Sequence, residues 1–337
     1  MLPVGWRAGC FILDMRAARI EEFRNPPVLV DVAEPERGAG QALVGPVAVP
    51  LNPIDIATAN GTFYGGSPET PYIPGSEGVG RVLEADSVEI GSLFYFSGDG
   101  LGRKRDGTLA ERTVVAEEVM FALPEGIAPE LAGACGTAGL AGWLPVTWRA
   151  KVRPDDRVLV LGCTGTVGLA AVQAARIIGA ERVIAAGRRP EGLALAAELG
   201  ADAIVNLDEE DLPSAFREAA GGDGPTVVID PLWGEPAVAA LEAAANGARI
   251  VQLGQSAGPT AEIRSATVRG KQLEILGYAN PQLPLEVRRE GYRELVEHAA
   301  AGRVSFPIET YPFEKTIDAW ERQASGSPAA KIVVTIP

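Results

Sequence analysis

The chain has 337 residues, 47% of them hydrophobic, and a formal net charge of −14 at pH 7. This length allows two domains with large cores, and no apolar run approaches the roughly 18 residues of a membrane-spanning helix. The negative charge argues against a nucleic-acid-binding surface. Three scattered cysteines fit a reducing compartment. We therefore expect a cytoplasmic protein whose partner is neither a membrane nor a nucleic acid.

The N-terminal third predicts a β-rich domain. Residues 1–14 lack the basic head, apolar core and cleavage site of a secretory signal, and we interpret them as an N-terminal extension. Short strand-like runs separated by close turns follow, among them residues 28–32, 41–49, 93–96 and 113–116. The Asn52-Pro53 pair suits the start of a helix or turn. Many short strands with close turns are typical of a small barrel-like domain.

From about residue 124 the pattern changes to alternating helices and strands. Residues 129–144 predict a helix rich in Ala and Gly. Buried strands recur with helices between most of them, at residues 158–161, 182–186, 203–205, 226–230, 248–253 and 273–276. This alternation predicts a doubly wound parallel sheet, so the fold class is α/β. The last stretch predicts two helices and a final strand, residues 331–336, that returns to the first domain.

A glycine-rich turn stands at the centre of this pattern. The strand at residues 158–161 stops at Gly162, and a helical pattern runs from Val167 to Gly179. Glycines let the backbone approach a phosphate, which then meets the free N–H groups and positive dipole end of the helix. The residues predicted to bind that phosphate are Gly162, Thr164, Gly165, Thr166, Val167 and Gly168.

The next predicted strand after the glycine-rich turn, residues 182–186, is followed by two arginines. The run is Gly187, Arg188 and Arg189, where an NAD site would place an acidic residue on the ribose hydroxyls. Two guanidinium groups suit a doubly charged 2′-phosphate instead. We therefore predict NADPH as the cofactor, with these three residues in its site. The alternative is that both arginines are only solvated at the end of a strand.

Seven short motifs follow one another along the chain. They are MRAA at 15–18, LNPID at 51–55, PGSEGVG at 74–80, GTLAE at 107–111, GTVG at 165–168, LGAD at 199–202 and AKIV at 330–333. In this order they resemble the medium-chain dehydrogenase/reductase superfamily, in its zinc-free quinone oxidoreductase-like branch. The resemblance covers nearly all of the chain from Met15 onward.

The resemblance implies a domain division. A GroES-like β-barrel at residues 15–120 would carry the substrate side, and a Rossmann domain at residues 121–280 would bind NADP. Residues 281–337 would return to the first domain, and the active site would be the cleft between the two. Family members often pair as homodimers through the Rossmann domain.

The resemblance also bears on zinc. Zinc-dependent relatives carry a catalytic Cys near residues 54–55, a Gly-His-Glu where this chain has residues 75–77, and a four-cysteine loop. Here Ser76 takes the position of the His, and no cysteine cluster exists between residues 86 and 112. Because a catalytic zinc needs three protein ligands, we predict no metal site.

Three residues become candidates for catalysis through the resemblance. Tyr64 is the candidate for hydrogen bonding a substrate carbonyl, although it comes one residue later than the Tyr of relatives. Its alternative role is that of a loop aromatic that only lines the pocket. Asn52 and Asp55 belong to the element that faces nicotinamide in relatives. Their alternative role is helix capping, which Asn and Asp favour.

Further cofactor contacts are implied at the ends of later strands. The matching residues are Asp230, Leu253, Gly254, Gln255 and Lys331, of which the first four follow the carboxyl ends of strands where ligands gather. Each has a plain alternative: Asp230 as part of a turn, Gly254 as a strand end, and Lys331 as an exposed charge on an edge strand.

The predicted function is transfer of a hydride from NADPH to a small molecule, either a quinone or the C=C bond of an α,β-unsaturated carbonyl compound. One alternative is a carbonyl or 2-enoyl-thioester reductase. The basic tip at residues 103–105 could then be a rim for a thioester carrier, although we expect a solvated loop. The other alternative is an NADPH-binding structural or sensor protein.

Overall fold

The computed structural model describes residues 14–63, 65–326 and 329–337. Most of the predicted N-terminal extension therefore lies outside the described residues. Strand β1 (Asp14–Arg19) begins at the last residue of that extension and pairs antiparallel with β2 (Val28–Ala33). None of the helices in the described ranges is both long and apolar enough to cross a lipid bilayer.

The first large sheet has seven strands, in the order β14-β15-β3-β4-β5-β7 with β6 paired to β3. Their bounds are β3 (Gln41–Pro50), β4 (Glu77–Glu84), β5 (Leu93–Ser97), β6 (Thr113–Ala116), β7 (Met120–Ala122), β14 (Ile308–Pro312) and β15 (Lys331–Thr335). Strand β15 runs antiparallel to β3, with Val334 opposite Val49. The C-terminal strand therefore returns to the first sheet, as predicted, whereas β14 and β7 were not predicted.

The second sheet has six parallel strands in the order β10-β9-β8-β11-β12-β13. Their bounds are β8 (Arg157–Leu161), β9 (Arg182–Gly187), β10 (Ala203–Asn206), β11 (Val227–Asp230), β12 (Arg249–Gln252) and β13 (Glu274–Gly277). The strand order reverses between β8 and β11, which is the switch point of a doubly wound nucleotide-binding sheet. This confirms the predicted Rossmann fold class.

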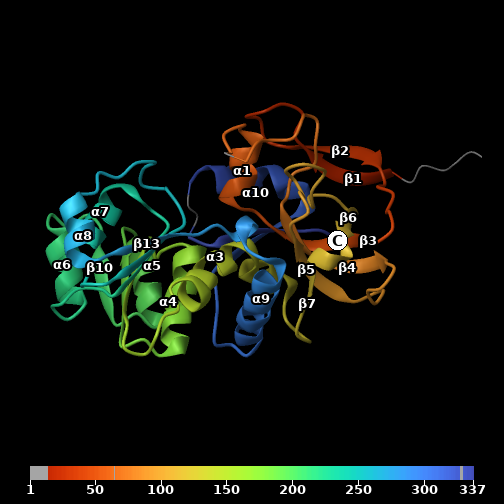
Figure 1. The fold of residues 1–337 in the computed structure, drawn as a ribbon. Helices are drawn as coiled ribbons and strands as arrows, with labels where there is room; N and C mark the ends of the chain where they lie inside the picture. Colours follow the sequence, from red (N-terminus) through yellow and green to blue (C-terminus); the bar gives the residue numbers. More distant parts are fainter. Residues whose placement is uncertain (1–13, 64, 327–328) are drawn as a thin grey trace, which may run out of the picture.

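The two sheets form two lobes with helices between and around them (Figure 1). The parallel sheet carries α4 (Thr166–Ile178), α5 (Pro190–Glu198), α6 (Leu212–Ala219), α7 (Gly234–Ala243) and α8 (Ser265–Lys271). Helices α1 (Pro53–Ala59) and α10 (Thr316–Ala324) pack on each other beside strands β14 and β15 of the first sheet, and α9 (Leu285–Ala300) lies near the middle of the molecule. Strands β8 and β9 are buried almost throughout, as expected of a sheet covered on both faces.

The predicted helix at residues 129–144 is interrupted. Helix α2 (Pro129–Ala134) leads into a wider π-helical turn, η2 (Cys135–Gly139), before α3 (Leu140–Leu144). Gly136 leaves the helical conformation with ψ −131°, and a Cβ there would lie 2.3 Å from Glu77 Oε2. The helix is therefore interrupted at Gly136, where the Glu77 carboxylate from β4 packs against the backbone and leaves no room for a side chain.

Glycine also sets the packing of α3 on α4. A Cβ at Gly142 would lie 2.1 Å from the Val167 carbonyl oxygen, so only glycine allows the two helices to approach this closely. Helix α4 ends at Gly179, whose φ of 83° is left-handed and whose N–H bonds the Ala175 carbonyl. The close approach at Gly142 joins α4, the helix of the glycine-rich turn, to α3.

Candidate active site between the two sheets

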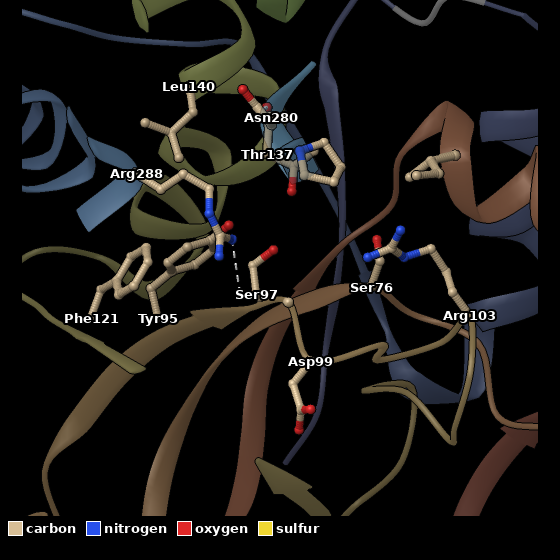
Figure 2. A pocket seen from close by; sticks show the side chains of 13 residues that line it. Ser76, Tyr95, Ser97, Asp99, Arg103, Phe121, Thr137, Leu140, Asn280 and Arg288 are labelled. Carbon is tan, nitrogen blue, oxygen red and sulfur yellow. Dashed lines mark hydrogen bonds between the residues drawn. The ribbon is translucent and has the colours of Figure 1, made fainter. Parts of the chain in front are cut away.

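A pocket of about 140 Å³ lies where β4 and β5 of the first sheet meet η2, α3 and α9. Its lining is mixed, and the polar side chains in it are those of Ser76, Tyr95, Ser97, Asp99, Arg103, Thr137, Asn280 and Arg288. Figure 2 shows Arg288 beside Tyr95 and Phe121 on one side, and Arg103 beside Ser76 on the other. Residues from segments far apart in the sequence therefore form one cavity.

Glu77 lies behind the wall of this pocket and is fully buried at the start of β4. Its Oε1 accepts a hydrogen bond from Asn52 Nδ2 at 2.6 Å. Its Oε2 accepts from Tyr95 Oη at 2.7 Å and from the Thr137 backbone N–H at 2.6 Å. The Lys331 ammonium lies 4.0 Å from Oε1. The buried carboxylate thus has three donors and a nearby cation, which a buried charge requires.

The break at Gly136 explains one of these donors. Because the chain leaves the helical path there, the next N–H, that of Thr137, points to Glu77 instead of to a helical carbonyl. Burial, reinforced by the neighbouring Glu77, raises the pKa of Tyr95 well above its usual value, so this phenol remains a donor. The sequence analysis missed Glu77 as a site residue; its signal is a lone acid within the glycine-punctuated run at residues 74–80.

Asn52 and Asp55, two of the predicted catalytic residues, both cap α1 and reach the network. The Asn52 N–H donates to Asp55 Oδ2 at 2.8 Å, which is half of a capping box. The side chain of Asn52 instead bridges Glu77 and Lys331, accepting from Lys331 Nζ at 2.5 Å. The capping alternative therefore describes Asp55 and the Asn52 backbone but not the Asn52 amide. Tyr64, the third predicted catalytic residue, lies outside the described residues.

Asp55 is a buried carboxyl group close to the pocket wall. Burial raises its pKa to about 6, although the Ser76 hydroxyl and the Asn52 N–H oppose the shift. Its Oδ1 is buried and has no hydrogen-bond partner among the residues that the structure describes. Since Ser76 lines the pocket, a carboxyl group whose pKa is raised to about 6 lies one side chain behind the cavity.

Lys331 is placed in this network and not on an exposed edge. Its Nζ donates to the Leu51 carbonyl at 2.8 Å and to Asn52 Oδ1, and the residue is only 4% exposed. Strand β15 is paired on both sides, with β14 and β3. The alternative of an exposed charge on an edge strand is therefore wrong. Burial lowers the pKa of Lys331, while the carboxylates of Glu77 and Asp55 oppose that shift.

The glycine-rich turn has the geometry of a phosphate cradle. Gly162 has a left-handed φ of 62°, and a Cβ at Gly168 would lie 2.4 Å from Cys163 Cα, which holds α4 close to β8. At Gly165 a Cβ would meet nothing within 4 Å, and α4 begins there without a side-chain cap. Open space therefore faces the uncapped helix start, as an anion site requires.

The two predicted arginines and Gly187 lie beside this turn. A Cβ at Gly187 would lie 2.5 Å from Thr164 Cγ2, so the end of β9 packs directly on the turn. The Arg189 guanidinium donates to the Thr164 carbonyl and lies 3.3 Å from the Thr164 hydroxyl. Arg188 is more exposed and pairs with Asp208 at 3.1 Å. The alternative of plain solvation therefore does not describe Arg189.

Asp230 forms a turn at the end of β11. Its Oδ1 accepts from the N–H groups of Leu232 at 2.9 Å and Trp233 at 2.8 Å. Burial raises the pKa of this carboxyl group, and the two N–H groups oppose the shift. The structure therefore gives Asp230 the turn role that was its alternative, and a direct cofactor contact stays a prediction.

The neighbouring segment after β12 lies against that turn. The Leu253 N–H donates to the Asp230 carbonyl at 3.0 Å. A Cβ at Gly254 would lie 2.4 Å from the Pro231 carbonyl oxygen, so the ends of β11 and β12 approach closely. Gln255 follows and is exposed. These residues gather at the carboxyl ends of the parallel strands, where ligands of such sheets bind.

Within residues 14–63, 65–326 and 329–337, no group of three or more His, Cys, Asp or Glu side chains is close enough to hold a metal ion. Both buried cysteines are poor ligands or nucleophiles as they stand. Burial raises the pKa of the Cys163 thiol to about 12 and that of Cys135 still further.

Comparisons with known proteins agree with this architecture. Residues 166–300 match the family model described as zinc-binding dehydrogenase. Quinone oxidoreductase of Rattus norvegicus is 30% identical over 268 residues, which are 78% of this chain and 79% of the rat protein. The chain belongs to the medium-chain dehydrogenase/reductase superfamily and is quinone oxidoreductase-like. The predicted family is thereby confirmed, and the protein is an oxidoreductase of a family that uses pyridine nucleotides.

Two further relatives extend the comparison. A subunit of the phenolphthiocerol/phthiocerol polyketide synthase of Mycobacterium tuberculosis is 30% identical over 91% of this chain. The chain spans only 14% of the length of that protein. The quinone oxidoreductase of Thermus thermophilus, whose structures include a complex with NADPH, is 30% identical with a TM-score of 0.79. That similarity covers 95% of this chain and all of the Thermus chain.

Proposed function

We propose that this member of the superfamily is an NADPH-dependent reductase that transfers a hydride to a quinone or to the C=C bond of an α,β-unsaturated carbonyl compound, without zinc. The observation that carries the proposal is the pair Arg188 and Arg189 beside the glycine-rich turn, with Arg189 hydrogen bonded to Thr164 of that turn. The Thermus relative, a quinone oxidoreductase with an NADPH complex, supports the same choice of cofactor.

The residues present fit this cofactor. The uncapped start of α4 and the open space at Gly165 would receive the pyrophosphate. Arg188 and Arg189 would bind the 2′-phosphate, for which guanidinium groups are suited by charge and by their fork of donors. Leu253, Gly254 and Gln255 lie at the carboxyl edge of the same sheet and would border the nicotinamide half. Bound NADPH supplies the hydride.

The protein's own groups handle the proton. When a hydride adds to the β-carbon of an enone, the electron pair moves to the carbonyl oxygen and the α-carbon must then take a proton. We assign Tyr64 to hydrogen bonding of the carbonyl oxygen. The pKa of Asp55 is raised to about 6, so this carboxyl group can take up and release a proton just below neutral pH, and the Ser76 hydroxyl stands between it and the pocket. Asn52 positions this element through Glu77 and Lys331.

The side chains available as metal ligands near the pocket support a zinc-independent reaction. Both oxygens of Glu77 already accept hydrogen bonds from three donors. Ser76, which stands where zinc-dependent relatives carry His, offers only a neutral hydroxyl. A zinc site would require three His, Cys or carboxylate ligands, and this pocket presents them in no such arrangement among the described residues.

Reduction of a 2-enoyl thioester is the second candidate function. The match to the polyketide synthase over 91% of this chain favours it, because a polyketide synthase carries its intermediates as thioesters. Hydride addition to the β-carbon and protonation of the α-carbon would be the same, and only the substituent on the carbonyl carbon, sulfur instead of carbon, differs. Relative kcat/KM for a quinone, an enone and an enoyl thioester separates these candidates.

The test is turnover by the purified full chain. We expect loss of NADPH absorbance with an ortho-quinone or a simple enone, in metal-free buffer and with no zinc found by elemental analysis. Stoichiometric zinc, or loss of activity on chelation, would contradict the proposal. NADPH binding without turnover of quinones, enones or enoyl thioesters would instead support a structural or sensor protein.

A homodimer in the cytoplasm completes the proposal. Strand β13 lies at the edge of the parallel sheet and exposes Ile275 by 40%. An exposed apolar edge is available for pairing with a second copy. Sedimentation equilibrium is expected to give twice the 35.2 kDa chain mass, and a monomer would refute this part of the proposal.

A further inference from the structure

Two arginines line the pocket, and the proposed hydride transfer uses neither of them. Arg103 comes from the loop after β5, and Arg288 from the first turn of α9. They lie on opposite sides of the cavity, with Ser97 between them (Figure 2). The predicted solvated loop at residues 103–105 is therefore corrected: Lys104 is exposed, but Arg103 lines the pocket.

Both arginines lack an ionic partner within the described ranges. Their Nε atoms are buried and have no hydrogen-bond partner there, and neither guanidinium forms a salt bridge to a described carboxylate. Arg288 makes one long bond, from Nη1 to the Ser97 carbonyl at 3.4 Å. The neighbouring Arg105, in contrast, pairs with Asp99 at 2.7 Å.

The carboxylates near the pocket are already compensated. Asp99 lines the cavity but is bound by Arg105. Glu77 is held behind Tyr95 by its three donors and the nearby Lys331. The cavity therefore keeps an excess of positive charge from Arg103 and Arg288.

This arrangement costs free energy in the empty pocket. Burial is the main cause that lowers the pKa of Arg288; Tyr95 opposes that shift, while the positive charges of Arg103 and Arg289 add to it. The first turn of the 16-residue helix α9 adds the positive end of its dipole at the same place. Partly buried cations become stabilising when an anion pairs with them.

We propose that the pocket binds a small substrate that carries a carboxylate group, with Arg103 and Arg288 as its anchors. The inference rests on the proposed function, because the reducible bond would lie in the same pocket. A planar carboxylate matches the fork of a guanidinium. The cavity of about 140 Å³ has the volume of roughly five water molecules, enough for a carboxylate and a short carbon chain.

The test compares a carboxylate with its neutral ester. We would measure kcat/KM with NADPH for 4-oxopent-2-enoate and for its methyl ester, which share the same enone. The wild-type protein is expected to prefer the acid. Replacing either arginine, by Arg103→Gln or Arg288→Gln, is expected to lower the ratio of acid to ester by about 10- to 100-fold, the worth of a charge-assisted hydrogen bond.

Matched control variants lie next to each arginine. Lys104→Gln and Arg289→Gln remove one positive charge each from exposed neighbours, and they are expected to change the ratio by no more than about twofold. Arg288→Lys keeps the charge and is expected to retain part of the preference. Equal loss in the control variants would show a general charge effect and overturn the assignment of the anchors.

A binding measurement separates this inference from the proposed function. Calorimetric titration with the saturated acid 4-oxopentanoate needs no turnover. Turnover of quinones with equal kcat/KM for acid and ester would overturn the carboxylate site and leave the proposed function standing. If the wild-type protein binds the acid, both arginine variants lose that binding and no acceptor is turned over, the carboxylate site stands and the proposed function is overturned. Arginine-dependent preference for a coenzyme A thioester over the acid would also overturn the carboxylate assignment.

Discussion

The glycine-rich turn and the Glu77 network are the two parts of the site, and they are built in opposite ways. The turn comes from one continuous segment, residues 162–168, whose backbone N–H groups and missing side chains make the cradle. The network joins five segments of the chain: the side chains of Asn52, Glu77, Tyr95 and Lys331 and the backbone N–H of Thr137. The turn depends on glycines, which have no side chain to fill the space for a ligand. The network depends on buried charges that compensate one another.

This difference predicts different responses to mutation. A side chain added at an open glycine leaves the fold intact and fills the space that a ligand needs. Removal of one member of a buried charge network leaves its partners uncompensated and destabilises the protein. Substitutions in the Glu77 network are therefore expected to change stability, and those at the open glycine of the turn to change affinity for the nucleotide.

The largest expected effect is at Glu77. In Glu77→Gln an amide replaces the carboxylate, so one donor among Asn52, Tyr95 and Thr137 meets another donor, and Lys331 loses its counter-charge. We expect the free energy of unfolding in urea to fall by about 4 kcal/mol. Glu84→Gln, at the exposed end of the same strand, is expected to cost less than about 0.5 kcal/mol. Equal costs would refute the central role of the network.

A pH effect of about 3 kcal/mol is expected from Asp55. Its pKa rises from 3.8 to about 6 on folding, so its contribution to stability is present below the unfolded value and is lost as pH rises through 6. Asp55→Asn keeps an oxygen for the Asn52 N–H but cannot ionise. The difference in unfolding free energy between about pH 3 and about pH 8 should shift by about 3 kcal/mol in this variant. An unchanged pH profile would contradict the buried state of Asp55.

Gly165→Asp separates affinity from stability on the nucleotide side. The new side chain has open space and becomes a favourable N-cap of α4, so the thermal midpoint should stay or rise slightly. Its carboxylate would occupy and repel the phosphate site, and we expect the Kd for NADPH to rise by about 100-fold or more. Gly270→Asp, at another glycine with open space, is the control for an added charge. NADPH binding that survives Gly165→Asp would contradict the cradle.

The smallest expected effect is at Asp208, which pairs with Arg188 on the surface. Asp208→Asn frees the guanidinium for a phosphate, and the Kd for NADPH should fall by about two- to threefold, since an exposed pair is worth little. NADH affinity should not improve in parallel. Glu209→Gln, an exposed neighbour, controls for the loss of one negative charge. A weaker affinity for NADPH in Asp208→Asn would contradict the role of Arg188.

The same contrast explains what could be predicted from the sequence. The parallel sheet and the glycine-rich turn follow from local patterns: apolar strands, a glycine turn, and helical spacing after Val167. The Glu77 network could not be found in this way, because its members meet only through long-range pairing of strands. The break at Gly136, inside an Ala- and Gly-rich helical pattern, depends on a carboxylate 59 positions earlier in the chain.

Lys331 and Arg103 show that local sequence also does not decide whether a charged side chain is buried or exposed. The sequence favours a solvated loop for Arg103 and offers an exposed edge as the alternative for Lys331, because a charge near a strand or loop is normally solvated. Pairing of β15 on both sides buries Lys331, and the fold of the loop after β5 turns Arg103 to the pocket. Only tertiary contacts decide whether such a charge is exposed.

Affinity for the two nicotinamide cofactors tests the central claim most directly. The Kd for NADPH and for NADH would be measured with the wild-type chain and with the double variant Arg188→Gln/Arg189→Gln. We expect the wild type to bind NADPH at least about 10-fold more tightly, and the double variant to bind both with similar affinity. Equal or tighter binding of NADH by the wild-type chain would contradict the account.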